Sequence, residues 1–331
     1  MKIVIITDVF LKSYKELYNR GSVIILWNII KYIKKKYNTS FEVYQMGDID
    51  DIFNYNDIKV NVIKSKSIEE FIKRIKKINF ECDILHFNNM DCYFNNKFKC
   101  TAIVHTNAYI ESKNGIEEFR KKIKQFNKII TVNKDYYNIF KNNNLVFIPN
   151  GIDLKLFKPK NIKYNKNIFF PNNPTPKKNV DFAFDLINKL GDEYRLYVAD
   201  DKSKYSINSK NIIFIGSGIN QKEMVKYYNK CFYVIVPSLS ESCSLCALES
   251  MAMKKRLIAN DIDGLKNYVK YKLISCNDID LWIKEIKSGF NDKIKDEINI
   301  NYNNTINSYD SVYMAESYYI MWKEVLDNYE N

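Results

Sequence analysis

The sequence predicts an α/β protein built from two successive doubly wound domains. Short apolar, β-branched segments such as KIVIIT (residues 2–7) are typical of buried parallel strands. Segments with apolar residues at helical spacing alternate with them, which is the pattern of βαβ units with helices on both faces of a sheet. The alternation restarts near residue 167, and 331 residues are long for a single hydrophobic core.

The first half of the chain is expected to form one parallel sheet with its covering helices. Its predicted strands share a short, apolar composition and lie at residues 2–7, 41–47, 83–89, 100–108 and 128–133, with a strand end and loop at 145–153. The helices between them have apolar residues at helical spacing and lie at 19–37, 68–80, 115–127 and 134–142.

The second half repeats the pattern after a junction at residues 151–166. Its predicted strands lie at 167–172, 194–200, 211–217, 232–238 and 256–261. Its predicted helices lie at 179–190, 220–231, 244–253 and 280–290, and residues 311–329 form a long amphipathic helix. In open sheets of this kind ligands bind at the carboxyl ends of the strands, so we expect the chemistry on the strand-to-helix loops.

Composition excludes several classes of protein and leaves the origin of the charge open. Hydrophobic content is 46% and charged content 27%, which indicates a globular rather than a disordered chain. The net charge of +12 fits either an anionic partner or a general richness in lysine, asparagine and isoleucine. The acidic Asp8 in the first ten residues argues against a secretory leader, and no apolar run is long enough for a membrane span.

The cysteines and histidines indicate a reduced protein without a zinc site. Seven cysteines are an odd number, and their spacing forms no disulfide framework, so we expect a cytosolic protein. Cys243 and Cys246 form a single C-x-x-C pair, and the chain contains only two histidines, His86 and His105. Structural zinc needs four ligands, which this set supplies poorly. We expect His86 to be a core residue.

The segment PSLSESCSLCALESMA (residues 237–252) carries the clearest chemical signal. A strand ends before it, and a helix begins near a serine, so the amides of residues 244–246 form an anion site suited to phosphate. Glu249 lies roughly 6 Å further along the helix axis, where its carboxylate can accept hydrogen bonds from a ribose diol. Glu241 precedes the helix, within reach of a sugar beyond the phosphates. Two acids with amides between them fit a nucleotide sugar.

This segment resembles the E-x7-E motif of the retaining GT-B glycosyltransferases of family 4. Other segments resemble the motifs of that family at consistent places, and they lie at residues 8–22, 145–159, 175–187 and 211–238. The resemblance implies two Rossmann-like domains that face a cleft. Residues 1–155 would bind the acceptor, 156–305 would bind the nucleotide sugar, and 306–331 would form a helix that returns to the N-terminal domain.

The resemblance also implies roles for individual residues. Glu249 would hold the ribose, and Glu241 would contact the donor sugar. Lys178 would bind the phosphates and stabilise the leaving nucleoside diphosphate. His105 would face the reacting sugar, so we expect His105, Glu241 and Lys178 to be the catalytic residues.

The rest of the donor site follows from the same resemblance. Backbone N–H groups of Ser244 and Leu245 would bind the diphosphate, and the base would lie near Ile215 and Gly216. Gly21, in the first loop, would let the backbone approach the donor. No obligatory metal or other cofactor is expected, although the adjacent carboxylates of Asp200 and Asp201 leave metal binding as an open alternative.

The sequence departs from the family pattern at several donor positions. Asn172 and Asn173 replace a Gly-Arg pair, so a bidentate phosphate ligand is missing at Asn173, which we still expect in the donor site. Residues 242–244 (Ser-Cys-Ser) replace Gly-Phe-Gly. Asn267 stands where an acid is usual, and a double glycine is reduced to Gly21 and Ser22.

We therefore expect a cytoplasmic retaining glycosyltransferase that uses a front-face mechanism. The expected donor is a UDP-sugar, with a GDP-sugar as the second choice, and the acceptor is a hydroxyl of a glycan or of a lipid-linked molecule. Basic amphipathic helices at residues 69–80 and 117–130 would either dock on an anionic membrane at the inner face or form a solvated surface.

Two other functions fit the same sequence. The chain would glycosylate modified bases in DNA if its positive charge serves to bind phosphates, and that binding would weaken steeply with salt. The loss of the family arginine at Asn173 instead fits a degenerate GT-B subunit that binds an active partner. Turnover of a donor by the isolated protein distinguishes an enzyme from such a subunit.

Overall fold

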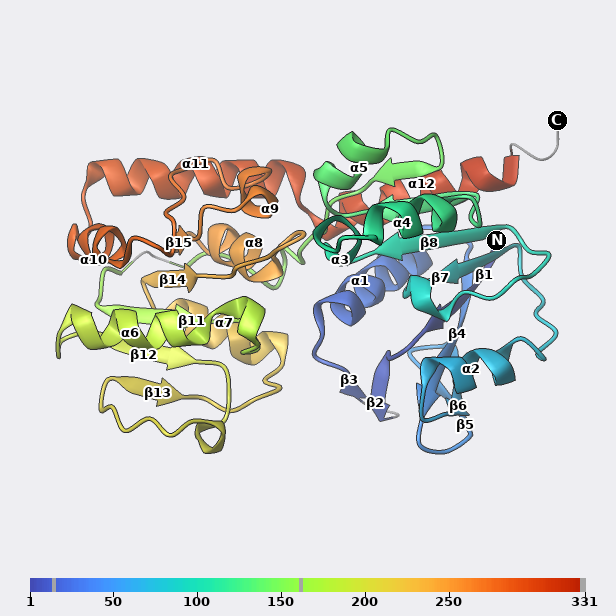
Figure 1. Cartoon of the computed structure of the whole chain (residues 1–331), viewed down its shortest axis with the longest axis horizontal. Coiled ribbons are helices and arrows are strands. Elements are labelled where there is room, and N and C mark those ends of the chain that lie inside the picture. The colour runs from blue at the N-terminus through green and yellow to red at the C-terminus, as the bar shows by residue number, and fades with distance from the viewer. Residues whose placement is uncertain (14–15, 161–162, 328–331) are drawn as a thin grey trace. The chain divides into compact units, whose positions relative to one another are not determined.

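The computed structural model describes residues 1–13, 16–160 and 163–327 of the chain (Figure 1). It divides into two compact units. Unit 1 contains Met1–Gly151 together with the C-terminal segment from Ser311, and unit 2 contains Ile152–Asp310. Each unit is built around its own sheet, and all strand pairs in the two sheets are parallel except one at the edge of the sheet of unit 1.

The sheet of unit 1 has the order β10-β9-β8-β7-β1-β4-β6-β5. Its central strand β1 (Lys2–Thr7) pairs in parallel with its two neighbours, so that Ile5 lies opposite Val43 on one side and His86 on the other. The remaining strands are β4 (Ser40–Gly47), β5 (Asp51–Tyr55), β6 (Ile58–Lys64), β7 (Ile84–Phe87), β8 (Cys100–Val104), β9 (Lys128–Thr131) and β10 (Leu145–Phe147). A two-stranded piece, β2 (Leu11–Ser13) with β3 (Glu16–Leu17), follows β1.

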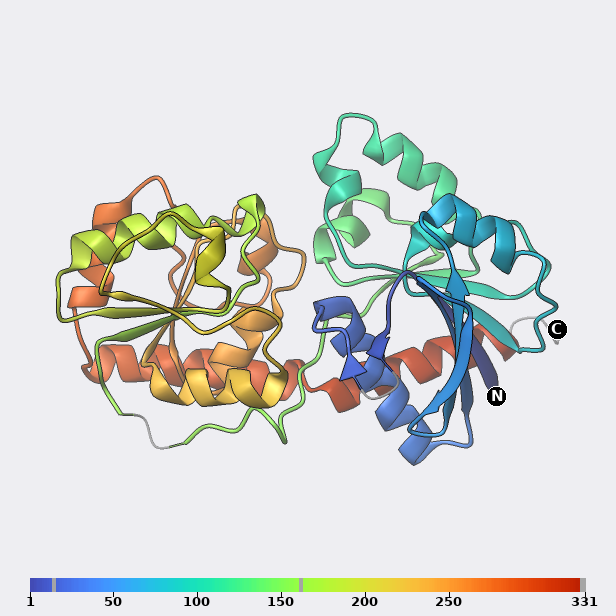
Figure 2. The same ribbon diagram turned by 90° about the horizontal axis from the view of Figure 1, so that it is seen from below.

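Helices cover both faces of this sheet (Figure 2). One face carries α1 (Gly21–Lys36) and α12 (Ser311–Asp327), and the other carries α2 (Ile68–Ile75) and α4 (Gly115–Ile123). The shorter elements are η1 (Met90–Cys92), α3 (Ala108–Glu111) and α5 (Lys134–Phe140). The apolar side chains of α2 and α4, such as Phe71 and Phe119, are buried in the core of unit 1. These two amphipathic helices therefore offer basic side chains to solvent, but their buried apolar faces are not available to a membrane.

The helix α12 is anchored by aromatic and polar contacts inside unit 1. Trp322 is fully buried, and its Nε1 donates to Thr101 Oγ1 at 3.1 Å. The same hydroxyl lies 2.9 Å from His86 Nδ1, and burial lowers the pKa of His86 to about 3. Tyr319 stacks on Tyr37 with the ring centroids 3.7 Å apart. The prediction that the C-terminal helix packs back on the N-terminal domain is thus confirmed, and His86 lies in the core.

Unit 2 contains a five-stranded parallel sheet with the order β13-β12-β11-β14-β15. Its strands are β11 (Asn167–Phe170), β12 (Arg195–Val198), β13 (Ile212–Phe214), β14 (Tyr233–Val236) and β15 (Arg256–Ala259). Its helices are η2 (Pro176–Lys178), α6 (Val180–Leu190), η3 (Lys202–Lys204), α7 (Gln221–Lys230), α8 (Leu245–Ala252), α9 (Asp263–Lys266), α10 (Ile279–Lys287) and α11 (Asp292–Ser308). The predicted α/β fold class is confirmed.

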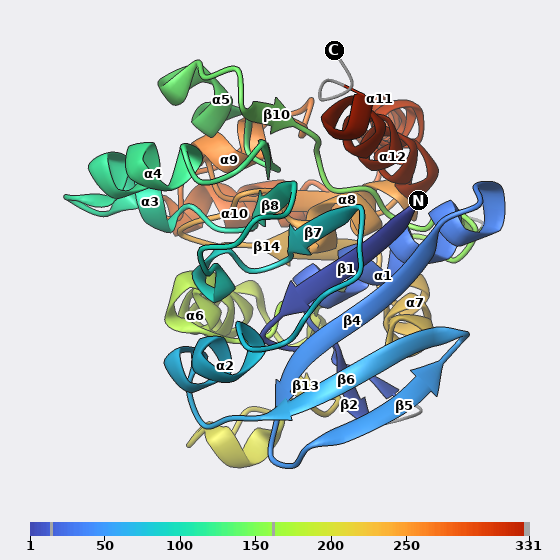
Figure 3. The same cartoon turned by 90° about the vertical axis from the view of Figure 1, so that its right-hand side faces the viewer.

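Several elements were not predicted, among them a hairpin and a long helix, and some predicted elements were too long. Strands β5 and β6 form an antiparallel hairpin at the sheet edge (Figure 3), closed by Asn56 and Asp57 at φ values of 49° and 59°. The helix α11 was missed because asparagines interrupt its apolar pattern. The helix predicted at 68–80 ends at Ile75, and the apolar residues that follow, Ile78 and Phe80, lie in a loop. The strand predicted at 100–108 ends at Val104.

Candidate functional site

The loops after β11 and β14 lie side by side, because these two strands are neighbours in the parallel sheet of unit 2. The N–H of Leu239 donates to the carbonyl of Lys177 at 2.8 Å, and Asn179 Nδ2 donates to the carbonyl of Pro237 at 3.3 Å. Lys178 Nζ lies 2.6 Å from Glu241 Oε1. The structure therefore brings together two predicted site residues that are 63 positions apart.

Glu241 is held in a buried position by its own backbone surroundings. The residue is only 7% exposed, and the start of α9 packs directly against its carbonyl group. A Cβ atom on Gly264 would lie 1.8 Å from the Glu241 carbonyl oxygen. Only glycine permits this approach, so Gly264 fixes the path of the loop that carries the acid.

The start of α8 has the predicted N-cap, but one of the two amides expected to bind the diphosphate already has a partner within the protein. Ser244 is the N-cap residue, and its Oγ accepts from the N–H of Ala247 at 3.4 Å. The N–H of Ser244 donates to the hydroxyl oxygen of Tyr268 at 2.7 Å. Leu245 follows as the first residue of the helix and is half-buried. Tyr268 was not recognised from the sequence, since nothing in its spacing links it to residue 244.

Glu249 is buried inside unit 2 and is bonded to the helix α7. It is 5% exposed, and Tyr228, which is fully buried, donates its hydroxyl to Glu249 Oε2 at 2.8 Å. Burial raises the pKa of Glu249 to about 8, although the hydrogen bonds from Tyr228 and Gln221 act in the opposite direction. Tyr228 was missed as a site residue because its position on α7 reads simply as a core position.

Cys246 connects the two acids electrostatically. Burial raises the pKa of its thiol, and the charges of Glu249 and Glu241 act in the same direction, while Lys178 opposes them. The pair of Lys178 with Glu241 and the buried Glu249 are therefore parts of one cluster at the start of α8. The raised pKa keeps Cys246 a neutral thiol, which gives the C-x-x-C pair no reactive thiolate at this residue.

The loop predicted to hold the base follows β13. Ile215 donates its N–H to the carbonyl of Val198 at 3.0 Å, and Gly216 donates to the carbonyl of Asp200 at 3.1 Å. Gly216 has a φ of 90°, a conformation that favours glycine. The Asp201 carboxylate accepts from the N–H and the hydroxyl of Ser217.

The two acids after β12 have partners within the protein. Asp200 accepts from Tyr205 Oη at 2.8 Å and pairs with Lys204. In the described ranges 1–13, 16–160 and 163–327, the structure contains no group of three or more metal-ligating side chains. The seven cysteines, all of which lie in these ranges, are free thiols.

The two asparagines that replace the family Gly-Arg pair differ sharply. Asn173 is exposed at the loop surface. Asn172 is 3% exposed, and its Nδ2 has no hydrogen-bond partner among the residues that the structure describes. An arginine at position 173 would therefore reach solvent from a loop that also carries Lys178.

Two predicted residues lie in unit 1. His105 follows β8, and its Nε2 lies 3.4 Å from Asn88 Oδ1, at the end of the neighbouring strand β7. Burial lowers the pKa of His105 to about 4, so its imidazole is neutral at physiological pH. Gly21 is the first residue of α1, directly after Arg20, whose guanidinium lies 3.6 Å from Asp8.

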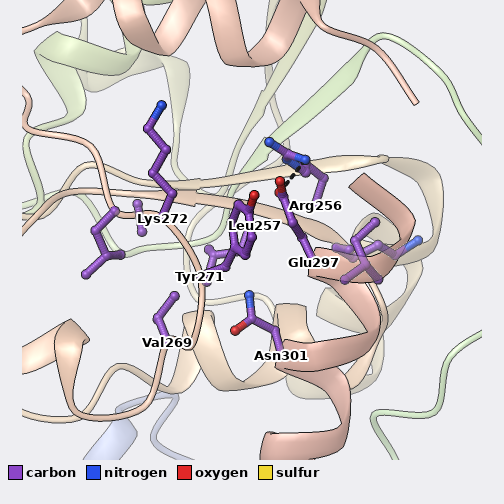
Figure 4. Close-up of a pocket in the computed structure, with 11 residues that line it drawn as sticks. Arg256, Leu257, Val269, Tyr271, Lys272, Glu297 and Asn301 are labelled. Carbon is purple, nitrogen blue, oxygen red and sulfur yellow. Dashed lines mark ion pairs between the residues drawn. The ribbon is translucent and has the colours of Figure 1, made fainter. Parts of the chain in front are cut away.

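A small cavity is lined by residues of β15, of α11 and of the segment 269–273 (Figure 4). It measures about 10 Å³, which is room for one water molecule at most. The guanidinium group of Arg256 points at Glu297 and also donates to Glu285 at 2.9 Å. Lys272 pairs with the same Glu285 at 2.8 Å. The charges are thus compensated inside the protein, and this cluster ties β15 to α10 and α11.

The chain has the fold of the GT-B glycosyltransferases, as its likeness to solved structures shows. Residues 153–305, which include the whole cluster around α8, match the family model described as glycosyl transferases group 1. Among curated proteins, the uncharacterized glycosyltransferase MJ1178 of Methanocaldococcus jannaschii is 30% identical over 155 residues. That match covers 43% of this chain and 42% of the relative, so the chain aligns with less than half of the relative's length.

Solved structures resemble the chain over nearly its full length. Sucrose-phosphate synthase from Thermosynechococcus elongatus superposes with a TM-score of 0.79 at 14% identity and covers 99% of this chain and 100% of that chain. The Anabaena protein HepE, in complex with UDP and glucose, has a TM-score of 0.72 at 13% identity and covers 98% of this chain and 100% of that chain. At these identities the likeness shows the fold, and it confirms the predicted GT-B fold class.

Proposed function

We propose that the protein is a retaining glycosyltransferase, of the family 4 type, that uses a nucleoside-diphosphate sugar as donor. The observation that carries this proposal is the cluster at the start of α8, in which Lys178 pairs with Glu241 beside the buried Glu249. The position of the cluster at the carboxyl ends of parallel strands supports it, because ligands of doubly wound sheets bind there.

In this proposal each group of the cluster has one task. Lys178 stabilises the negative charge that develops on the leaving diphosphate. Glu241 accepts hydrogen bonds from hydroxyl groups of the donor sugar, and the amide of Leu245 at the helix start contributes to the phosphate site. Glu249 accepts the ribose diol. Asn173 lies on the same loop as Lys178 and contacts the donor without the charge that an arginine would supply.

The proposed transfer proceeds on one face of the sugar. The acceptor hydroxyl oxygen forms a bond to the anomeric carbon as the bond from that carbon to the diphosphate oxygen breaks. The acceptor proton passes to the departing diphosphate, so no protein nucleophile and no obligatory metal take part. His105 serves as a neutral hydrogen-bonding group toward the reacting sugar, since its lowered pKa leaves it uncharged.

The donor is proposed to be a UDP-sugar, with a GDP-sugar as the second choice. The complex of the similar HepE with UDP and glucose supports uridine, although it concerns that protein. The base would lie against Ile215 and Gly216, where the backbone turns at a positive φ. Gly21, the first residue of α1, is proposed to contact the donor.

The acceptor is proposed to be a glycan or a lipid-linked hydroxyl, used in the cytoplasm. Among the described residues, none of the helices is both long and apolar enough to cross a bilayer. Contact with the inner face of a membrane would be electrostatic, through the exposed lysines and arginines of α2 and α4, because the apolar side chains of these helices are buried.

The test is nucleotide binding and donor hydrolysis by the purified chain. Isothermal titration with UDP, GDP and ADP is expected to show binding of one nucleotide, and Glu249→Ala is expected to abolish it. The surface variant Glu193→Ala serves as the matched control, since its carboxylate lies in unit 2 on an exposed loop. Binding of none of the three nucleotides would contradict the proposal and favour a non-catalytic GT-B subunit.

The DNA-modifying alternative is decided in parallel. Salt-sensitive binding of duplex DNA, with sugar transfer to it, would replace the glycan or lipid acceptor in this proposal. The absence of both results would remove the alternative.

A further inference from the structure

The buried side chain of Tyr228 is held by contacts to both its ring and its hydroxyl group. Its ring makes edge-on contacts with Phe169 and Phe157, with centroid distances of 5.1 Å and 6.1 Å. These contacts fix the ring, so the hydroxyl has little freedom. It lies 2.8 Å from Glu249 Oε2 and 3.3 Å from the carbonyl oxygen of Cys246.

The chemistry of these groups decides where the proton points. A phenol donates one proton, and an ionised carboxylate is a stronger acceptor than a backbone carbonyl. The shorter distance, to Glu249, agrees with that preference. A carboxylate offers about four lone-pair positions. Tyr228 and Gln221 occupy two of them from α7, which leaves positions for two hydroxyl groups of a ligand.

We propose that Tyr228 is the positioning residue of the ribose site, whose hydroxyl holds the Glu249 carboxylate in the orientation that receives the diol. This inference rests on the proposed function, because it assumes that Glu249 binds the ribose. Tyr228 itself is fully buried and acts through Glu249 rather than by touching the donor.

The hydrogen bond also affects the charge of the acid. It favours the ionised carboxylate, so its removal makes ionisation harder in this buried place. The other groups that act on this charge are Gln221 on α7 and the Cys246 thiol on α8, which in turn interacts with Lys178 and Glu241. The Tyr228 hydroxyl also contacts Cys246, so the effect of Tyr228→Phe is attributed to Glu249 by comparison with the Glu249→Ala variant.

The experiment compares Tyr228→Phe with Tyr227→Phe in the full-length chain. Tyr227 is the neighbouring residue on α7, and its ring contacts Phe169 and Tyr197 rather than an acid. Affinity for the nucleotide that binds the wild type, among UDP, GDP and ADP, is measured between pH 6 and 9. Tyr228→Phe is expected to weaken binding about tenfold at pH 9, where the Glu249 carboxylate of the wild type is ionised, because this is the usual cost of one hydrogen bond to a charged group.

The pH profile separates positioning from a loss of structure. The acid limb of binding is expected to move to higher pH in Tyr228→Phe and to stay in place in Tyr227→Phe. With donor turnover, KM for the donor should rise while kcat changes little. An unchanged profile in Tyr228→Phe, beside a Glu249→Ala variant that no longer binds, would overturn the positioning role alone. Full binding by Glu249→Ala would overturn the ribose site and this inference together.

Discussion

Lys178 Nζ and Glu241 Oε1 lie 2.6 Å apart, so the cation proposed for the phosphates is paired with the acid proposed for the donor sugar. Glu241 is almost fully buried, and the lysine side chain is 26% exposed. The lysine therefore neutralises a buried carboxylate as well as being available to a ligand.

Lys178→Ala is expected to lower both donor turnover and stability. The change leaves Glu241 buried without its cation, which costs about 3 kcal/mol in the free energy of unfolding. Urea denaturation and donor hydrolysis measure the two effects. Lys177→Ala is the matched control, because Lys177 is the exposed neighbour on the same loop, and it should leave stability nearly unchanged. Equal effects of the two variants would argue against the pairing.

Gly264→Ala is expected to displace the loop that carries Glu241. The added Cβ would lie 1.8 Å from the Glu241 carbonyl oxygen, and relief of that overlap costs about 1–3 kcal/mol. Nucleotide affinity should fall while the fold is retained, as circular dichroism would show. Gly289→Ala is the control, since a Cβ there meets only Tyr164, whose hydroxyl oxygen would lie 3.6 Å away, and strains a φ of 72°. Loss of nucleotide affinity in both variants would show a general effect of added methyl groups.

The stability of the protein should fall as pH rises through the range in which Glu249 ionises. Its pKa is about 8 in the folded chain and near 4.5 in the unfolded chain, so the folded state holds one more proton between these values. Stability from this group is fully present below pH 4.5 and is lost up to pH 8, with a slope approaching about 1.4 kcal/mol per pH unit. Thermal unfolding of Glu249→Gln should lack this contribution, and an unchanged slope in that variant would refute the assignment.

Asn173→Arg should tighten nucleotide binding. The position is exposed on the loop that carries Lys178, so an arginine there adds a bidentate phosphate ligand, worth about 1.5–3 kcal/mol. Isothermal titration with UDP measures the gain. Asn208→Arg, at another exposed asparagine of unit 2, adds the same charge elsewhere. A similar gain from both variants would indicate general electrostatic attraction instead.

Trp322→Phe is expected to destabilise unit 1 by about 1 kcal/mol or more, since it removes the N–H that Thr101 accepts. Lys323→Ala, at an exposed position of α12, is the control. The midpoint of urea denaturation checks both. A wild-type midpoint in Trp322→Phe would show that the anchor of α12 is purely apolar.

Much of the fold could be predicted from the sequence because buried parallel strands are recognisable as short apolar runs. KIVIIT and YVIV form β1 and β14, each of which has a neighbouring strand on both sides. The hairpin of β5 and β6 lacked that signal, since no residue of the edge strand β5 is buried and polar residues interrupt the apolar run of β6. The helix α11 was hidden by asparagines, although its buried residues Ile294 and Ile298 follow helical spacing.

The candidate site was only partly predictable. Glu241 and Glu249 stood out because their motif spans few residues, and Lys178 belongs to a second motif at residues 175–187. The structure brings Lys178 and Glu241 into contact. Tyr228 and Tyr268 contact the same segment from 21 and 24 positions away, and nothing in a single sequence reports such contacts. The close approach of Gly264 to Glu241 is likewise a property of the folded backbone.

The place of α12 affects how the chain is made. Unit 2 is one uninterrupted segment, whereas unit 1 needs a helix that is translated after the whole of unit 2. During synthesis, unit 2 can therefore reach its native state first. At that stage the sheet of unit 1 is still uncovered at His86 and Thr101, because Trp322 has not yet been translated. A nascent chain halted after residue 310 should hold a finished second unit and an unfinished first one, whose exposed apolar surface is what a chaperone recognises.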